Sequence, residues 1–161
     1  MSPAAKLDAM DEPAAREALA ASCGAHRWAD AMLARRPFGS DTALHRAADE
    51  VWSEMEREDV LEAFAHHPRI GGELPKLRER WPAQEQSGVV GASEETLVAL
   101  RDENLRYERR FGYIFIVCAS GKSAGEMLAI LRERIGNDPT TELRIAAAEQ
   151  AKITHIRLEK L

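Results

Sequence analysis

The stretch DTALHRAADEVWSEM, residues Asp41–Met55, shows most clearly how this chain folds. Its apolar residues recur at spacings of three and four, which places them along one face of an α-helix. They are Leu44, Ala47, Ala48, Val51, Trp52 and Met55. The breakers Pro37 and Gly39 come just before, and Ser40 or Asp41 is suited to cap the first turn. The stretch therefore predicts an amphipathic helix with one buried face.

Helical patterns continue on both sides of this stretch. They predict helices over about 13–22, 25–36, 93–110 and 141–159, another ending near Ala65, and short pieces over 74–80 and 83–87. Ser123 and Glu126 form a capping box that opens one more helix, which ends at Gly136-Asn137. The apolar run YIFIVCA, 113–119, has strand propensity, but one strand cannot make a sheet. We predict an all-α, single-domain helical bundle over residues 1–161, with one short apolar non-helical segment.

Composition excludes several classes of protein. The 161 residues carry a net charge of −5 with acidic and basic residues interspersed, which argues against a nucleic-acid binder. The N-terminus lacks the apolar core of a signal peptide, and the longest apolar run is too short to cross a bilayer. Cys23 and Cys118 form neither a C-x-x-C pair nor a disulfide framework. We expect a cytoplasmic protein with reduced thiols that binds neither nucleic acid nor membrane.

The most unusual motif is AHHPRIGG, Ala65–Gly72, at the end of a predicted helix. Pro68 and the two glycines stop the helix, and the segment that follows is rich in proline, glycine and glutamine. A histidine held by a following proline can act as a general acid and base, because its pKa lies near neutrality. The same histidines can equally be surface polar residues at a turn. Glu85 is the candidate carboxylate partner, eighteen residues downstream of His67.

Two other kinds of site fit the sequence poorly. SGKS, 120–123, opens a helix after an apolar run, but a phosphate-binding loop needs glycine where this chain has Ile116. A helix N-cap explains these residues better. Neighbouring histidines on a helix project about 100° apart and rarely chelate one ion, and the chain has no H-E-x-x-H motif. We therefore expect neither a metal site nor a phosphate-binding loop here.

Five stretches together resemble the 2-oxo-4-hydroxy-4-carboxy-5-ureidoimidazoline (OHCU) decarboxylase family, which acts in urate breakdown. They are CGAHRWADAM (23–32), AHHPRIGG (65–72), EQSGV (85–89), FGYIFIVCASGKS (111–123) and AAAEQAKITHIRLEKL (146–161). Their order and spacing match, and they span nearly the whole chain. The resemblance implies an all-α, cofactor-independent enzyme, usually a homodimer, that converts a small anionic ureide to S-allantoin.

The resemblance also implies which residues form the site. The catalytic histidine is the one directly before proline, His67, and its partner is Glu85. The substrate-binding residues implied are Pro68, Pro82, Ala83, Gln84, Gln86, Phe115, Ile116, Val117, Cys118 and Ala119. Backbone amides of the apolar run 115–119 would meet the substrate, which explains a non-helical run in a helical protein.

Two positions depart from the family pattern. Pro82 replaces a serine found three residues before the glutamate, and Ala25 replaces the serine of a cysteine-glycine-serine motif. Neither touches the predicted His–Glu pair, so the expected activity stands while the substrate contacts change. Two alternatives remain open at this point: a non-enzymatic helical adaptor, and a metal-dependent ureide hydrolase.

Overall fold

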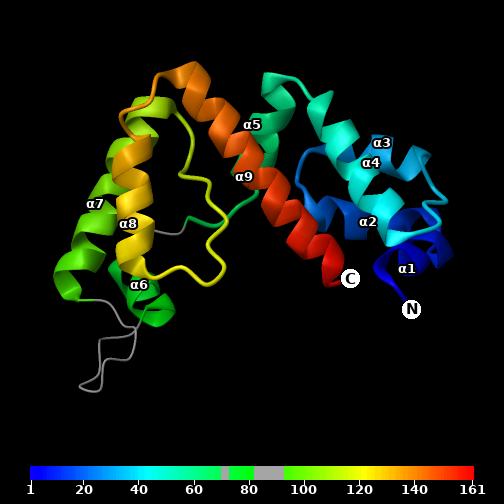
Figure 1. Ribbon diagram of the computed structural model, residues 1–161, viewed down its shortest axis with the longest axis horizontal. Helices are drawn as coiled ribbons and strands as arrows, with labels where there is room; N and C mark the ends of the chain where they lie inside the picture. Colours follow the sequence, from blue (N-terminus) through cyan, green and yellow to red (C-terminus); the bar gives the residue numbers. More distant parts are fainter. Residues whose placement is uncertain (70–72, 82–92) are drawn as a thin grey trace. The chain divides into compact units, whose positions relative to one another are not determined.

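The structure is a computed structural model that describes residues 1–69, 73–81 and 93–161. Over these residues every regular element is a helix, as predicted (Figure 1). The helices are α1 (Pro3–Ala9), α2 (Glu12–Ser22), α3 (His26–Ala34), α4 (Asp41–Ser53), α5 (Arg57–Ala65), α6 (Leu74–Arg80), α7 (Glu94–Phe111), α8 (Ala124–Arg134) and α9 (Pro139–Glu159). None of these helices is long and apolar enough to span a bilayer.

The chain divides into two compact units. The first comprises Met1–His67 and Ala147–Leu161, and the second Pro68–Ala146. The apolar face predicted on α4 lies in the core of the first unit, with Leu44 and Val51 buried beside Trp28 and Met32 of α3. Ser40 caps α4 by accepting a hydrogen bond from the Ala43 N–H at 3.1 Å. The hydrophobic periodicity of this stretch thus locates the core of the first unit.

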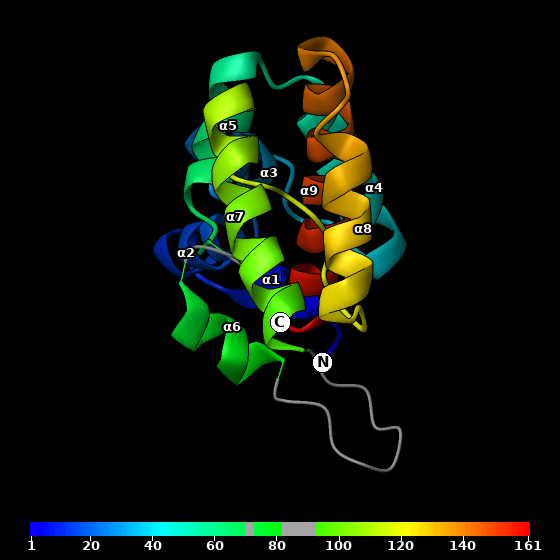
Figure 2. The same ribbon diagram turned by 90° about the vertical axis from the view of Figure 1, so that its left-hand side faces the viewer.

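The second unit has its own core between α6, α7 and α8. Helices α7 and α8 lie side by side (Figure 2), and Leu77, Leu100, Tyr107, Met127 and Leu131 fill the space between the three. The capping box predicted at Ser123 and Glu126 is present, with both hydrogen bonds formed. This core supports the apolar run that follows α7.

The run 114–119 is neither helix nor strand in the structure. Phe115, Ile116 and Val117 are buried, while Cys118 and Ala119 are partly exposed. Gly112, with φ of 82°, ends α7 in the left-handed conformation and lets the chain turn into this run. The buried, non-helical segment predicted from its composition is therefore confirmed.

A short N-terminal helix is the element that periodicity does not predict. α1 has only seven residues, too few to show a repeating apolar stripe. Ser2 caps it, Pro3 occupies the first turn, and Ala4 and Leu7 are buried against the first core. The Ala4 N–H donates to Asp41 Oδ1 at 2.9 Å, so a long-range contact joins α1 to the start of α4.

Candidate active site

The two histidines of AHHPRIGG directly follow α5. His66 is the C-cap of the helix, and the backbone N–H of His67 still donates to the Phe64 carbonyl at 3.1 Å. Pro68 and Arg69 leave the helical path, as the proline requires. This turn places His67, the last residue of the first unit, on a rigid helix end rather than on a long loop.

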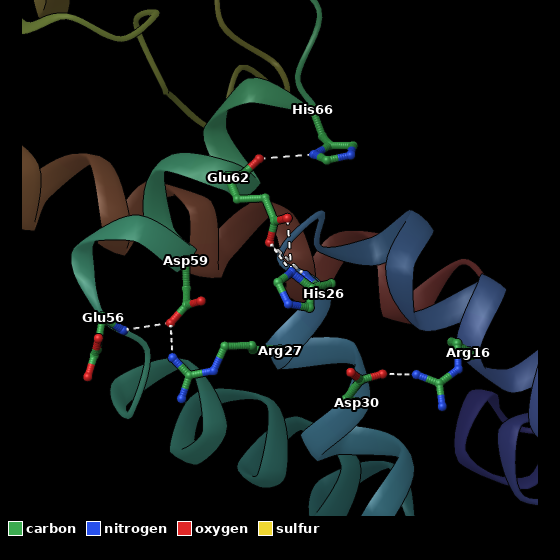
Figure 3. Close-up of polar contacts among 8 residues, drawn as sticks. All are labelled: Arg16, His26, Arg27, Asp30, Glu56, Asp59, Glu62 and His66. Atoms are coloured by element: carbon green, nitrogen blue, oxygen red, sulfur yellow. Dashed lines mark hydrogen bonds and ion pairs between the residues drawn. The ribbon is translucent and has the colours of Figure 1, made fainter.

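The side chains of the two histidines have different environments. His66 is exposed, and its Nδ1 lies 2.9 Å from the Glu62 carbonyl oxygen one turn earlier (Figure 3). The ring of His67 is partly buried, and its Nε2 contacts Gln150 Oε1 of α9. Its Nδ1 lies 3.3 Å from Arg157 Nη2, also on α9. Of the two, only His67 is held among polar partners that lie far away in the sequence.

Burial lowers the pKa of His67 from its ordinary value of 6.5. The hydrogen bond to Gln150 acts in the opposite direction, and the charges of Arg157 and His66 lower the pKa further. The net direction is downward, so the imidazole is neutral at physiological pH and can accept a proton. A neutral base beside a fixed cation suits the activation of an anionic substrate.

A small ion-paired framework positions α5, which carries both histidines. Glu62 accepts hydrogen bonds from the His26 backbone N–H at 2.9 Å and from the His26 ring (Figure 3). The His26 backbone N–H, and after it the His26 side chain, lowers the pKa of Glu62. Arg27 pairs with Asp59 at 2.8 Å, and Asp59 also accepts from the Glu56 N–H. The start of α3 is thereby tied to α5 at two points.

Gly24 packs directly on His66, which explains the glycine in CGAHRW. A Cβ at Gly24 would lie 2.5 Å from His66 Cγ and 2.6 Å from His66 Cβ. Both distances are far below van der Waals contact, and the His66 Cβ cannot move without its backbone. The requirement here is space: any side chain at Gly24 displaces the turn that carries His67.

Gly24→Ala is therefore expected to lower kcat and to destabilise the fold by about 1–3 kcal/mol, as overpacking does. Gly125→Ala is the matched control, because a Cβ there meets only Ser123 Oγ, at 3.9 Å. The double variant Gly24→Ala/His66→Gly removes the clash and should recover activity. Thermal melts and steady-state kinetics check this, and a double variant no better than Gly24→Ala would contradict it.

The other predicted substrate contacts fall in three places. Pro68 is exposed and is the first residue of the second unit. The apolar run belongs to the same unit, and its predicted contacts are Phe115, Ile116, Val117, Cys118 and Ala119. Glu85, together with Pro82, Ala83, Gln84 and Gln86, lies outside the described residues, as does the predicted helical piece over 83–87. The structure therefore describes one member of the predicted catalytic pair, His67, and the apolar run.

The backbone of the apolar run is held by its carbonyl groups. The Ile116 carbonyl accepts from Arg134 Nη1 at 2.7 Å, and the Cys118 carbonyl accepts from Lys122 Nζ at 2.6 Å. Arg134 also lies over the Phe115 ring, 4.7 Å from its centroid. Within the described part of the chain, no acceptor pairs with the amides of Phe115, Ile116 and Val117. The role of these amides in substrate binding stays a prediction.

Gln150 and Arg157 are site residues that the sequence motifs do not single out. Both lie on α9, 83 and 90 residues from His67. Gln150 is fully buried although it is polar, and it continues a hydrogen-bond chain to Thr154 at 3.0 Å. The signal in the sequence is a polar set, Gln150, Thr154 and Arg157, spaced i, i+4 and i+7 on one helical face.

Over the described residues, no cluster of three or more His, Cys, Asp or Glu side chains has a geometry that could hold a metal ion. What the structure does present is a half-buried neutral histidine, a buried amide and a cation, held by helices. This arrangement is typical of a helical protein that uses acid–base chemistry.

The comparisons with known proteins make the class specific. A protein-family model described as OHCU decarboxylase matches residues 8–159, and the chain belongs to this family. A uric acid degradation bifunctional protein of Arabidopsis thaliana is 38% identical over 144 residues, covering 86% of this chain and 44% of that protein. The mouse 2-oxo-4-hydroxy-4-carboxy-5-ureidoimidazoline decarboxylase is 32% identical, covering 83% of this chain and 77% of the mouse protein.

A solved structure supports the same assignment. It is the crystal structure of an OHCU decarboxylase in the presence of (S)-allantoin, which is 36% identical, with a TM-score of 0.73. The match covers 88% of this chain and 94% of that one. The chain spans less than half the length of the bifunctional relatives it matches in Arabidopsis thaliana and Bacillus subtilis. The predicted family and the predicted helical fold are both confirmed.

Proposed function

We propose that this protein catalyses the cofactor-independent decarboxylation of 2-oxo-4-hydroxy-4-carboxy-5-ureidoimidazoline to S-allantoin, with His67 as the proton-transfer residue. The observation that carries the proposal is the partly buried ring of His67, held between Gln150 and Arg157. Family membership supports it, as does the likeness to a decarboxylase crystallised in the presence of (S)-allantoin.

The substrate contains its own electron sink. One ring carbon carries a hydroxyl and a carboxylate, and the neighbouring ring carbon is an imine carbon bearing the ureido group. When the bond to the carboxylate breaks, its electron pair forms a carbon–carbon double bond, and the imine electron pair moves to nitrogen, which takes up a proton. The resulting enol then loses its hydroxyl proton while the neighbouring carbon gains one. No external electron sink is needed for this sequence.

The residues of the site match the demands of this chemistry. Neutral His67 accepts the hydroxyl proton, and as imidazolium it is the donor to the neighbouring carbon. Arg157 supplies a positive charge beside the His67 ring for the anionic substrate. Glu85 is proposed as the second catalytic residue and Gln86 as a hydrogen-bond partner of the ring or ureido amides. The amides of the apolar run 115–119 would bind a substrate oxygen.

The direct test is an assay with freshly generated substrate, followed by circular dichroism for chiral allantoin, with and without a chelator. The expected result is faster formation of the S enantiomer, unaffected by the chelator. A rate and product no different from the spontaneous reaction would reject the enzyme and favour the helical adaptor. Loss of activity with chelator, restored by a divalent ion, would favour the metal-dependent hydrolase.

The lowered pKa of His67 predicts the pH dependence of the reaction. The acidic limb of kcat/KM should lie below pH 6.5, because free His67 remains a base at lower pH than an ordinary histidine does. His67 binds protons more readily when unfolded, so its contribution to stability is complete above pH 6.5 and falls as pH drops through the folded pKa. Arg157→Gln should move the acidic limb of kcat/KM to higher pH, because it removes a positive charge that lowers the pKa of His67. An acidic limb of kcat/KM at or above pH 6.5 in the wild type would contradict the assignment of His67 as the base.

Family resemblance also leads us to propose a homodimer in the cytoplasm. Neither Cys23 nor Cys118 is in a disulfide in the structure, which suits a reducing compartment. Light scattering distinguishes a dimer from the 17.9 kDa single chain.

A further inference from the structure

Among the described residues, the ring of His67 has one polar partner at each nitrogen, and both lie in the same unit as His67. Nε2 contacts Gln150 Oε1, and Nδ1 lies 3.3 Å from Arg157 Nη2. A neutral imidazole carries a proton on only one of these nitrogens, and that choice decides which nitrogen can act as the base.

Arg157 settles the choice. A guanidinium group has N–H donors and no acceptor, so the nitrogen facing it must be an acceptor. Nδ1 of His67 is therefore unprotonated, and the proton of the neutral ring sits on Nε2. Gln150 must then present its oxygen to Nε2, since its NH2 group would place two donors face to face.

The remaining contacts of Gln150 agree with this direction. Its Nε2 donates to Thr154 Oγ1 at 3.0 Å, and the Thr154 side chain lowers the pKa of the Cys23 thiol, against the larger effect of burial, which raises it. Gln150, Thr154 and Cys23 are all buried, so water does not compete for these groups. The hydrogen bonds form a continuous series in which each group donates to the next, from Arg157 through His67 and Gln150 to Thr154.

We propose that Gln150 and Thr154 are positioning residues that fix His67 as its Nε2–H tautomer, so that Nδ1 is the nitrogen that exchanges protons with the substrate. This inference rests on the proposed function for its role in catalysis. It assigns the orientation of the imidazole to an amide on α9, so Glu85 is not needed for that role.

An amide in this position has a specific effect on reactivity. It accepts the Nε2 hydrogen bond but carries no charge, so it stabilises the imidazolium far less than a carboxylate would. When Nδ1 takes up a proton, it can no longer accept a hydrogen bond from Arg157, and the guanidinium beside it carries the same charge. The proton is therefore held weakly and is available for return to the substrate carbon. The arrangement favours a base that accepts and then releases a proton on one side of its ring.

The tautomer can be read without substrate. The probe is protein labelled with 15N in its five histidines, examined by long-range 1H–15N spectra above the titration range of histidine. The His67 signals are identified as those missing from a His67→Asn sample. The expected pattern is protonated Nε2 and unprotonated Nδ1. A spectrum with the proton on Nδ1 would overturn the proposal, whether or not the protein decarboxylates the substrate.

Variants separate positioning from a merely structural role. Gln150→Glu keeps the acceptor and adds a charge, so the tautomer should persist while the acidic limb of kcat/KM moves to higher pH. Gln150→Met removes the acceptor and should lower kcat about tenfold, the order expected for one lost hydrogen bond, with less change in KM. Thr154→Val should weaken the tautomer preference, whereas Thr154→Ser, which keeps the hydroxyl, should restore the wild-type spectrum.

Two results would decide against this role. An acidic limb that stays in place in folded Gln150→Glu would show that the amide does not control the imidazole. Equal spectra for Thr154→Val and Thr154→Ser would show that the hydroxyl takes no part. If the wild type shows the Nε2–H tautomer but forms no S-allantoin, the proposed function fails while the tautomer assignment stands.

Discussion

His67→Asn is expected to lower kcat by about 10²–10⁴-fold, the usual contribution of a positioned acid–base residue. Asparagine is polar and close in reach, but its amide cannot accept and return a proton near neutral pH. The value of KM should change far less, because Arg157 and the amides of the apolar run remain to bind the anion. Steady-state kinetics measure both quantities, with thermal melts to show that the variant is folded.

The neighbouring His66 is the matched control for this experiment. It is exposed, and among the described residues its ring contacts the Glu62 carbonyl and packs on Gly24. His66→Ala should therefore keep most of its kcat. Near-wild-type kcat in folded His67→Asn, or an equal collapse in both variants, would show that the roles of the two histidines are wrongly assigned.

Glu142→Gln is expected to destabilise the protein by about 3–5 kcal/mol, because it leaves a buried positive charge without its counter-ion. Glu142 is fully buried, and its carboxylate binds Arg134 at 2.6 Å, Asn137 Nδ2 at 3.1 Å and the Tyr107 hydroxyl. Burial, followed by the bond to Glu142, raises the pKa of Tyr107, so the phenol stays a donor. Glutamine preserves the shape of the side chain while removing its charge.

Thermal and urea unfolding measure the loss in Glu142→Gln. The exposed pair Arg78–Glu94 supplies the control, since Glu94→Gln removes an ion pair that water already screens. The double variant Arg134→Met/Glu142→Leu should be less damaging than Glu142→Gln alone, because no unpaired charge is left. A small loss of stability in Glu142→Gln would show that other groups or water solvate the Arg134 charge. Arg134 also donates a hydrogen bond to the Ile116 carbonyl, so a large loss of stability in Glu142→Gln would be expected to disturb the apolar run as well.

Most of the fold could be predicted from the sequence because apolar periodicity reports directly on burial. The predicted starts of α2, α3, α4 and α7 agree with the structure to within one residue, and the end predicted for α8 was two residues beyond Arg134. The C-terminal helix begins at Pro139, two residues before the predicted start. Helix ends are set by capping contacts, which periodicity does not measure.

The candidate site was only partly predictable, and α9 shows why. The large apolar residues of this helix include Ile153 and Ile156, both of which are only partly buried. The fully or nearly fully buried positions are Glu142, Ala146, Gln150, Thr154 and Leu158, a stripe with i+4 spacing in which three members are polar. A hydrophobic pattern cannot reveal buried polar groups, because their burial depends on partners far away in the chain.

The His-Pro motif was easier to recognise because its chemistry is local. A histidine before proline at a helix end is visible in eight consecutive residues, whereas the partners of His67 lie more than eighty residues downstream. The resemblance included the C-terminal stretch that contains Gln150 and Arg157 but gave neither residue a role. The three-dimensional contacts supply that role.

The buried Cys23 gives the protein an intrinsic chemical reporter. Its side chain is fully buried, and burial raises the pKa of the thiol to about 11. Thiol reagents attack the thiolate, so Cys23 reacts only after the surrounding structure opens. The alkylation rate of Cys23 therefore reports how often the structure around Thr154 and Gln150 opens. Slow labelling of this one sulfur would measure how long His67 keeps its partners between such openings.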